Sequence, residues 1–575
     1  MKRLFPILLI LALLCGCAAQ ENNEMTQPAA TTPAATEPLQ AYTPEEIPYT
    51  SACETETGIT LSDSGITVNG GEETEAVYTS HDIIYYEDKD AYESGYIYGE
   101  GAANERHSAQ EAAEHTVVNI TEPGVYRISG KLSKGQIRID LGESAYEDEN
   151  ARVELILENA DITCTVAPAI LFLNVYECDG NWSADTAKAE VDTAAAGANL
   201  ILQGENKVTG SHVAKIFRDK EGEKKLWKQD GAIYSYMSMN VYGPGSLDLT
   251  ADNEGLDTEL HLTVNGGNIA IRSQNDGINT NEDGVSVTTV NGGSLHIIAG
   301  LGQEGDGIDS NGYLVINGGT VVASANPGAD AGMDSDMGSY INGGMVIATG
   351  STMDWAETDS RQVTMNLQFA ANQDSGAAIT VTRQDGTVVF AYDPSEDEVL
   401  AENRRVFQGA ILSSPNFCVG ESYYVYLDGR ITGEETGGMY DVTTVSDFAG
   451  GTQMQYTGTD VTRRPGGFGG QRPEGMGEFD PNSEGKGGFG GQRPEGMENF
   501  DPNSEGKGGF GGQKPEGMED FDPSQIPEGE MPSMPSRPQG FDRPDSQQGG
   551  ENVESKTLFY MQDKVNFFSG LAPAE

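Results

Sequence analysis

Acidic side chains recur within a short motif of Gly, then Leu, Ile or Met, then Asp or Asn, then Thr or Ser. The third positions of its four copies are Asp257, Asn279, Asp309 and Asp334. Alternate side chains of a strand face opposite ways, so an inward Leu, Ile or Met sends the third-position side chain outward. Successive coils that stack about 4.8 Å apart would align these side chains in a column. Glu254, Asp276 and Asp306 begin a neighbouring column.

Such columns pose an electrostatic problem. Two carboxylates about 5 Å apart repel each other by about 3 kcal/mol at an effective dielectric constant near 20. Residues 231–350 contain 14 acidic side chains and a single basic one, Arg272. Ca²⁺ is a hard cation that takes six to eight oxygen ligands, so it could neutralise the columns. We interpret them as calcium sites. The alternative is that Asp and Asn only terminate strands as turn formers and hydrogen-bond in a ladder.

The motif lies inside a longer repeat that indicates its structural frame. Four Asn-Gly-Gly triplets start at Asn265, Asn291, Asn317 and Asn342, with spacings of 26, 26 and 25 residues. A β-type run precedes and follows each triplet, and Asn-Gly supplies the positive φ angles of tight turns. A strand, a glycine turn, a strand and a polar turn in about 25 residues predict one coil of a β-solenoid. The 3.6-residue periodicity of helical repeats is absent.

Composition narrows the function classes. The 575 residues include 34 basic and 90 acidic side chains, for a formal charge of −56. Nucleic-acid binding is disfavoured because a phosphate backbone requires a basic surface. No internal apolar run reaches the length of about 20 residues that spans a bilayer, so a polytopic membrane protein is excluded. Six cysteines are too few for a disulfide scaffold.

The N-terminal residues predict export. Lys2 and Arg3 precede a short apolar run, as in a signal peptide. Residues 14–17, Leu-Cys-Gly-Cys, resemble a bacterial lipobox in which Cys17 would be lipidated, although Cys15 departs from the commoner Ala, Ser or Thr. We expect an extracellular lipoprotein held to the cell membrane through this lipid alone. Ordinary cleavage and secretion is the alternative.

The repeats resemble those of a known group, the extracellular bacterial carbohydrate-binding proteins built on a right-handed parallel β-helix similar to that of pectate lyases. The resemblance includes residues 124–132 and 135–137 upstream and β-type segments at 364–427. It implies calcium along the helix and recognition of plant-type polysaccharides, including cellulose and pectic chains. Residue by residue, it implies metal ligands at Asp257, Asp276, Asn279, Asp306, Asp309 and Asp334. Asn279 and Ala331 replace acids of the pattern, so not every coil need hold an ion.

These observations together predict an all-β chain. We expect a lipoprotein signal peptide (1–17), a disordered linker (18–48) and a right-handed parallel β-helix (49–350) with an acidic, tyrosine-rich insertion at about 71–115. A small β-rich module (351–450), low-complexity 21-residue repeats rich in Gly and Pro (451–553) and a terminal β segment (554–575) would follow. The repeats contain too few apolar residues to stack a core, which favours a disordered spacer.

Calcium-dependent, non-catalytic binding of an extracellular polysaccharide is the favoured function. A lyase needs a base to remove the C5 proton of a uronate, and Arg272 is the one cationic residue of the repeat region. A hydrolase needs two carboxylates as acid and base, and calcium would keep them ionised. A polysaccharide lyase or hydrolase and a structural surface adhesin are the alternatives.

No sugar-binding residue follows from the sequence. Six aromatic side chains could stack on sugars, although packing in the core or at coil ends is the favoured role for each: Trp182, Trp227, Trp355, Tyr234, Tyr236 and Tyr242. His261 and His296 are interpreted as solvated strand residues.

Overall fold

The structure is a computed structural model that describes residues 39–40, 47–49, 51, 55–85, 107–214, 217–218, 224–225, 228–351, 354–401, 405–459 and 555–575. The expected signal peptide with Cys17, most of the linker and almost all of the 21-residue repeats lie outside these residues. The chain divides into Met1–Leu39 and Gln40–Glu575, and the description below concerns the second unit. Among the described residues, no helix has both the length and the apolar character needed to span a membrane.

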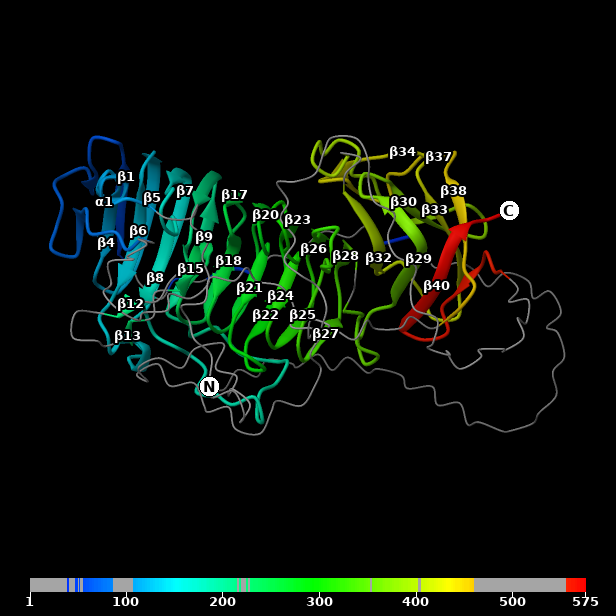
Figure 1. Cartoon of the computed structure of the whole chain (residues 1–575), viewed down its shortest axis with the longest axis horizontal. Coiled ribbons are helices and arrows are strands. Elements are labelled where there is room, and N and C mark those ends of the chain that lie inside the picture. Colours follow the sequence, from blue (N-terminus) through cyan, green and yellow to red (C-terminus); the bar gives the residue numbers. More distant parts are fainter. Residues whose placement is uncertain are drawn as a thin grey trace, which may run out of the picture. The chain divides into compact units, whose positions relative to one another are not determined.

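The predicted all-β class is confirmed, since nearly all regular structure consists of strands. Most of them belong to three parallel ladders, in which strands follow one another side by side from β5 to β28 (Figure 1). Each ladder takes one strand from each successive coil. Apolar side chains at alternate positions face a common core, as in β20 (Asn268–Ser273), where Ile269 and Ile271 are buried and Asn268 is exposed. Because successive side chains of a strand face opposite ways, the alternation of apolar and polar residues in the sequence determines which side chains are buried in the core and which face the surface.

The first ladder contains the strands that precede the Asn-Gly-Gly turns. Its members are β9 (Ala198–Gln203), β16 (Met239–Tyr242), β19 (Leu262–Val264), β22 (Val287–Val290), β25 (Tyr313–Ile316) and β27 (Gly338–Ile341). Three earlier strands extend it: β7 (Val153–Thr163), β5 (Gly124–Leu132) and β1 (Glu56–Leu61). A short strand, β2 (Thr67–Val68), pairs antiparallel with β1.

The second ladder contains the strands that follow those turns. After the end of β7 it comprises β10 (Glu205–Gly210), β17 (Ser246–Ala251), β20, β23 (Ser294–Ile298), β26 (Thr320–Ser324) and β28 (Met345–Gly350).

The third ladder carries the acidic motif. It comprises β4 (Thr116–Ile120), β6 (Gly135–Asp140), β8 (Ile170–Asn174), β15 (Gly231–Ser235), β18 (Glu254–Thr258), β21 (Ile278–Thr280) and β24 (Ile308–Ser310). At its edge β3 (Val77–Ser80), which lies in the expected 71–115 insertion, pairs antiparallel with β4. Helix α1 (Ala109–Ala113) precedes β4, and a 3-10 turn covers Ala145–Glu147. Four short strands form two hairpin-like pairs between β10 and β15: β11 (Val213–Ala214) with β14 (Lys228–Gln229), and β12 (Phe217–Arg218) with β13 (Lys224–Lys225).

The Asn-Gly-Gly triplets connect the first ladder to the second. In each of the four, the second glycine has a positive φ, for example 76° at Gly293. A Cβ at Gly293 would also lie 2.6 Å from the carbonyl oxygen of Gly267 in the preceding coil, so the close stacking requires glycine. The asparagine side chains form a ladder of their own. Asn291 Nδ2 donates to Asn265 Oδ1 at 2.9 Å, and Asn317 and Asn342 repeat this contact with the asparagine before them, at 2.9 and 3.0 Å.

The strands after β28 form a mostly antiparallel module joined to the second ladder through β28 and β32 (Val406–Ser413). Its other strands are β29 (Thr364–Asp374), β30 (Ile379–Arg383), β31 (Val388–Tyr392), β33 (Ser422–Leu427), β34 (Arg430–Thr432), β35 (Glu435–Thr436), β36 (Met439–Tyr440), β37 (Asp447–Ala449), β38 (Thr452–Gln455), β39 (Phe559–Tyr560) and β40 (Val565–Pro573). β40 pairs parallel with β29, although the 21-residue repeats separate them in sequence. The Arg405 guanidinium donates to the carbonyl oxygens of Ala299 and Ala325, at 2.9 and 2.6 Å, and so connects the module to the coils.

Candidate metal centre

The third positions of the acidic motif stack in register on the third ladder. Asp257 pairs with Asn279, and Asn279 pairs with Asp309. In the next coil Met333 bridges Ile308, and the carbonyl oxygen of Asp334 accepts from the Ser310 amide at 3.2 Å. The preceding residues Leu256, Ile278, Ile308 and Met333 are fully buried in the core. The alternation deduced from the motif thus sends the four polar side chains to the outer side of this ladder.

The neighbouring column is also present. The carbonyl oxygens of Asp230, Asp276 and Asp306 each accept a backbone amide from an adjacent coil, which aligns these residues with Glu254. The carboxylates are held in place as well. Asp276 Oδ1 accepts from the amide of Asp306 at 2.6 Å, and Asp306 Oδ1 accepts from the amide of Ala331 at 2.5 Å. The carboxylates of Asp276 and Asp306 therefore each point toward the following coil.

In the described part of the chain, two groups of three carboxylates are close enough to share an ion. One consists of Asp230, Glu254 and Asp257, and the other of Asp306, Asp309 and Asp334; within each, one oxygen per residue lies within 4.8 Å of the others. Ca²⁺–O distances are 2.3–2.6 Å, so two ligands on opposite sides of one ion lie about 5 Å apart. The spacing and the hard oxygen donors therefore fit calcium. The first group is buried and the second is half-buried.

The structure adds two residues to the set expected from the sequence. Asp230 and Glu254 belong to the buried group, whereas the sequence placed Glu254 only at the start of a column and gave Asp230 no role as a metal ligand. The Asp-Gly-Ala-Ile segment at residues 230–233 is recognisable in the sequence as a degenerate earlier copy of the motif, which is the signal that points to Asp230.

Electrostatic strain is visible in the pKa values. Burial, followed by the charge of Asp334, raises the pKa of Asp309 to about 8. Burial and the charge of Glu254 raise the pKa of Asp276 well above its ordinary value, and burial and Asp334 do the same for Asp306. Burial penalises the ionised form and neighbouring like charges add to the penalty. Without a cation, these carboxylates therefore retain protons that ordinary aspartates lose.

Asn279 lies between the two carboxylate groups and gives an independent indication of a ligand. Its side chain is 6% exposed. Among the described residues, no donor forms a hydrogen bond with its buried Oδ1 atom. A buried amide oxygen without a donor costs about 1–3 kcal/mol. Amide oxygens are among the ligands that Ca²⁺ takes in proteins.

Arg272 lies on a different ladder from the acidic columns. It belongs to β20 of the second ladder, and its guanidinium contacts Asp397 Oδ2 at 3.4 Å and Asp248 Oδ1 at 4.0 Å. Arg272 therefore forms ion pairs with Asp397 and Asp248, and neither of these residues belongs to the acidic columns.

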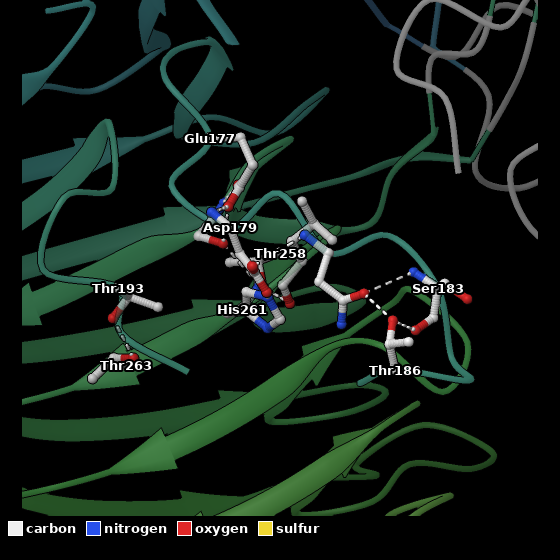
Figure 2. A network of polar contacts seen from close by, with 11 residues as sticks. Glu177, Asp179, Ser183, Thr186, Thr193, Thr258, His261 and Thr263 are labelled. Carbon is white, nitrogen blue, oxygen red and sulfur yellow. Dashed lines mark hydrogen bonds and ion pairs between the residues drawn. The ribbon is translucent and has the colours of Figure 1, made fainter. Parts of the chain in front are cut away.

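The interpretation of His261 as a solvated residue is wrong, because the segment after β8 covers it (Figure 2). His261 is 1% exposed, and its Nε2 lies 3.2 Å from Asp179 Oδ2, a hydrogen bond that lowers the pKa of Asp179. Glu177 secures the same segment, since it accepts from the amide and hydroxyl of Ser238 at 2.7 and 2.9 Å. His296 is half-buried. Neither burial could be deduced from strand periodicity.

Most of the aromatic candidates pack rather than face solvent. Trp355 is 4% exposed and Tyr234 is fully buried, while Trp182 and Tyr236 pack partly buried against the core. Trp227 lies outside the described residues. Tyr242 is 8% exposed and packs on Tyr49, with ring centroids 4.8 Å apart.

Comparisons with known proteins identify the family. A carbohydrate-binding domain-containing protein of Acetivibrio thermocellus is 28% identical over 157 residues, which cover 27% of this chain and 45% of that relative. The matched region thus spans less than half of the relative's length. A solved structure, titled as the polysaccharide lyase-like protein from C. thermocellum in a gadolinium derivative, is 20% identical with a TM-score of 0.32, and the match covers 50% of this chain and 93% of that one. A family model for the carbohydrate-binding domain-containing protein matches residues 114–411, more than half of the chain, so the protein belongs to this family.

Proposed function

We propose that the protein is a non-catalytic, extracellular polysaccharide-binding protein whose ladders close into a right-handed parallel β-helix held together by calcium. The chain visits the first, second and third ladders in the same order in successive coils, as from β19 to β20 to β21 to β22. A closed helix accounts for this order, and parallel crossovers are right-handed in nearly all proteins. The family to which the chain belongs supports the carbohydrate partner.

The two carboxylate groups, in a segment with a single basic residue, carry the calcium part of the proposal. Asp230, Glu254 and Asp257 would hold one ion, and Asp306, Asp309 and Asp334 a second. Asp276 and Asn279 lie in the coil between the groups and supply further oxygens. Bound calcium would neutralise the carboxylates. The backbone amides of Asp306 and Ala331 hold the carboxylates of Asp276 and Asp306 in place.

Calorimetry on chelator-treated, desalted protein tests this proposal. We expect about two calcium ions to bind per chain and the melting temperature to rise by at least about 5 °C when calcium is returned. Asp248→Asn is the matched control, because Asp248 is an exposed carboxylate on the second ladder. That variant should bind calcium like the wild type. Absence of binding heat, together with identical melting with and without chelator, would rule out the calcium sites.

Sedimentation with insoluble cellulose or pectin, with and without EDTA, tests polysaccharide binding. A polyuronate is repelled by the charge of −56 unless a cation bridges the two, so any binding of pectic chains should disappear with the chelator. Catalysis is tested in parallel by incubation with polygalacturonate. The sharing of Arg272 between Asp248 and Asp397 favours a binding protein over a lyase. New unsaturated products or reducing ends would contradict the non-catalytic assignment.

Lipidation of Cys17 would hold this binding protein on the cell surface. The expected outcome of Cys17→Ala is release of the protein from the membrane fraction. A variant that stays with the membranes would contradict lipid anchoring.

A further inference from the structure

The outer face of the first ladder has a regular pattern of polar side chains that the calcium sites do not use. Thr263, Thr289, Val315 and Tyr340 pair in register on four successive coils. Asn265, Asn291 and Asn317 follow the same strands and form their hydrogen-bonded ladder alongside. A row of hydroxyl groups, interrupted by Val315, therefore lies beside a row of amides, and the members of each row are one coil, about 4.8 Å, apart.

A loop forms a wall beside this face. Thr193 Oγ1 lies 2.7 Å from both Asn240 Oδ1 and Thr263 Oγ1, and Figure 2 shows Thr193 directly at Thr263. At the other end of the loop, Glu190 contacts Arg361 at 3.1 Å, and the Arg361 amide donates to Asn342 Oδ1, the last member of the asparagine ladder. The loop is thus attached near both ends of the row of coils.

A groove of about 250 Å³ lies between wall and face. We call it the Thr–Asn groove; it is lined by Ile47, residues 189–194, Tyr242, Thr263, Asn265, Thr289, Asn291, Val315 and Asn317. Tyr242 borders it at one end. Beyond Val315 the face continues into Tyr340, whose ring contacts that of Tyr313 with centroids 6.3 Å apart. Tyrosine rings combine an apolar face with a hydroxyl group, a combination suited to sugar rings.

The charge of the groove restricts its ligand. Its lining contains two acids, Glu190 and Asp192, and no Lys or Arg. Arg361 and Arg152 contact the outer wall through Glu190 and the Ala194 carbonyl oxygen, but neither lines the groove. A uronate chain would therefore meet the charge of Asp192 without a cation in the lining, whereas a neutral glycan can exchange hydrogen bonds with hydroxyls and amides at no such cost.

We propose that the Thr–Asn groove binds a neutral, hydroxyl-rich glycan whose chain lies along the first ladder. This inference rests on the proposed carbohydrate-binding function and assigns the site and the class of glycan. The groove strands β19, β22 and β25 belong to the same coils as β18, β21 and β24, which carry the carboxylates. Loss of calcium therefore weakens binding indirectly, because it loosens the stacking of the coils that form the groove.

The test measures binding of cellohexaose, xylohexaose, mannohexaose and hexagalacturonate to the full chain by calorimetry in calcium. Thr289→Trp fills the floor of the groove, and Thr289→Val removes only the hydroxyl. Thr250→Trp is the matched control, since Thr250 is an exposed threonine on the second ladder. We expect at least one neutral hexasaccharide to bind, with affinity reduced at least tenfold by Thr289→Trp, less by Thr289→Val and not at all by Thr250→Trp.

Melting and calcium titration of each variant show that the coils are intact. Neutral binding that survives Thr289→Trp in a folded, calcium-binding protein would overturn the groove assignment and leave carbohydrate binding standing. Binding of hexagalacturonate alone would overturn the class of glycan. If the wild type bound none of the four sugars, the groove proposal and the proposed function would both fail.

Discussion

Two columns of polar side chains run along the coils: the asparagine ladder and the acidic column of the third ladder. They differ in whether neighbouring side chains can form hydrogen bonds with one another. In the asparagine ladder, each amide donates to the amide before it at 2.9–3.0 Å, because an amide carries both donors and acceptors. The column of Asp257, Asn279 and Asp309 has the same in-register stacking, but ionised carboxylates only accept. The same backbone geometry therefore lets amides hydrogen-bond to one another but brings carboxylates together that repel one another, which is the basis of the proposed calcium sites.

The strongest test of this comparison converts one column into the other. An Asp257→Asn, Asp309→Asn double variant places three consecutive amides on the third ladder and removes one carboxylate from each group. We expect calcium affinity to fall at least about 100-fold, because each removed carboxylate is a proposed ligand of the hard cation. Without calcium at pH 8, the variant should melt several degrees above the stripped wild type, since the repulsion between neighbouring carboxylates is relieved. Calorimetry and thermal melting measure both effects.

Asp248→Asn again serves as the control, because it removes one exposed carboxylate charge, half of the double variant's change, from the second ladder. If it weakened calcium binding as much as the double variant did, the effect would come from net charge and not from the column. Unchanged calcium affinity in the double variant would contradict the assignment of the ligands.

The pH dependence of the calcium-free protein sharpens the contrast. The pKa of Asp309 is raised from 3.8 to about 8 in the folded protein. Between these values the folded state holds a proton that the unfolded state has lost, so stability decreases as the pH rises. We expect stripped protein to melt at least about 5 °C lower at pH 8 than at pH 5.5. Saturating calcium should remove this slope, because the ion displaces the protons.

The high negative charge of the chain also destabilises it at high pH, so the double variant provides the control for this experiment. Its slope between pH 5.5 and 8 should be shallower than that of the wild type. Equal slopes would show that the pH dependence does not come from the column, and a melting temperature that rose with pH would contradict the raised pKa.

Strand alternation and the recurring motif were enough to predict that the third positions face outward and align in a column, but not how turns of different lengths preserve that alignment. The successive spacings between Asp257, Asn279, Asp309 and Asp334 are 22, 30 and 25 residues. Asp257, Asn279 and Asp309 nevertheless stack in register, because the turns absorb the differences. Asp230 was not assigned as a ligand, although its segment is a degenerate copy of the motif, because the short strand pairs β11–β14 and β12–β13 interrupt the repeat before it.

An irregular segment outside the repeat also explains why the interpretation of His261 as a solvated residue was wrong. The residues after β8 place Glu177 and Asp179 against Ser238 and His261. These contacts depend on how an irregular segment folds back over the coils, which a periodic pattern does not encode. The same segment supplies the wall of the Thr–Asn groove, so the proposed sugar site was equally beyond the reach of the sequence.

The smallest expected effect comes from the converse substitution in the asparagine ladder. Asn291→Asp keeps the acceptor for Asn317 Nδ2 but removes the donor to Asn265 Oδ1. We expect the free energy of unfolding to fall by about 1–3 kcal/mol, the cost of a buried polar group that loses its partner, with calcium affinity unchanged because the third ladder is untouched. Chemical denaturation measures the change. A loss of calcium binding would show that the two columns are coupled, and undiminished stability would mean that the amide ladder contributes nothing to the stacking of coils.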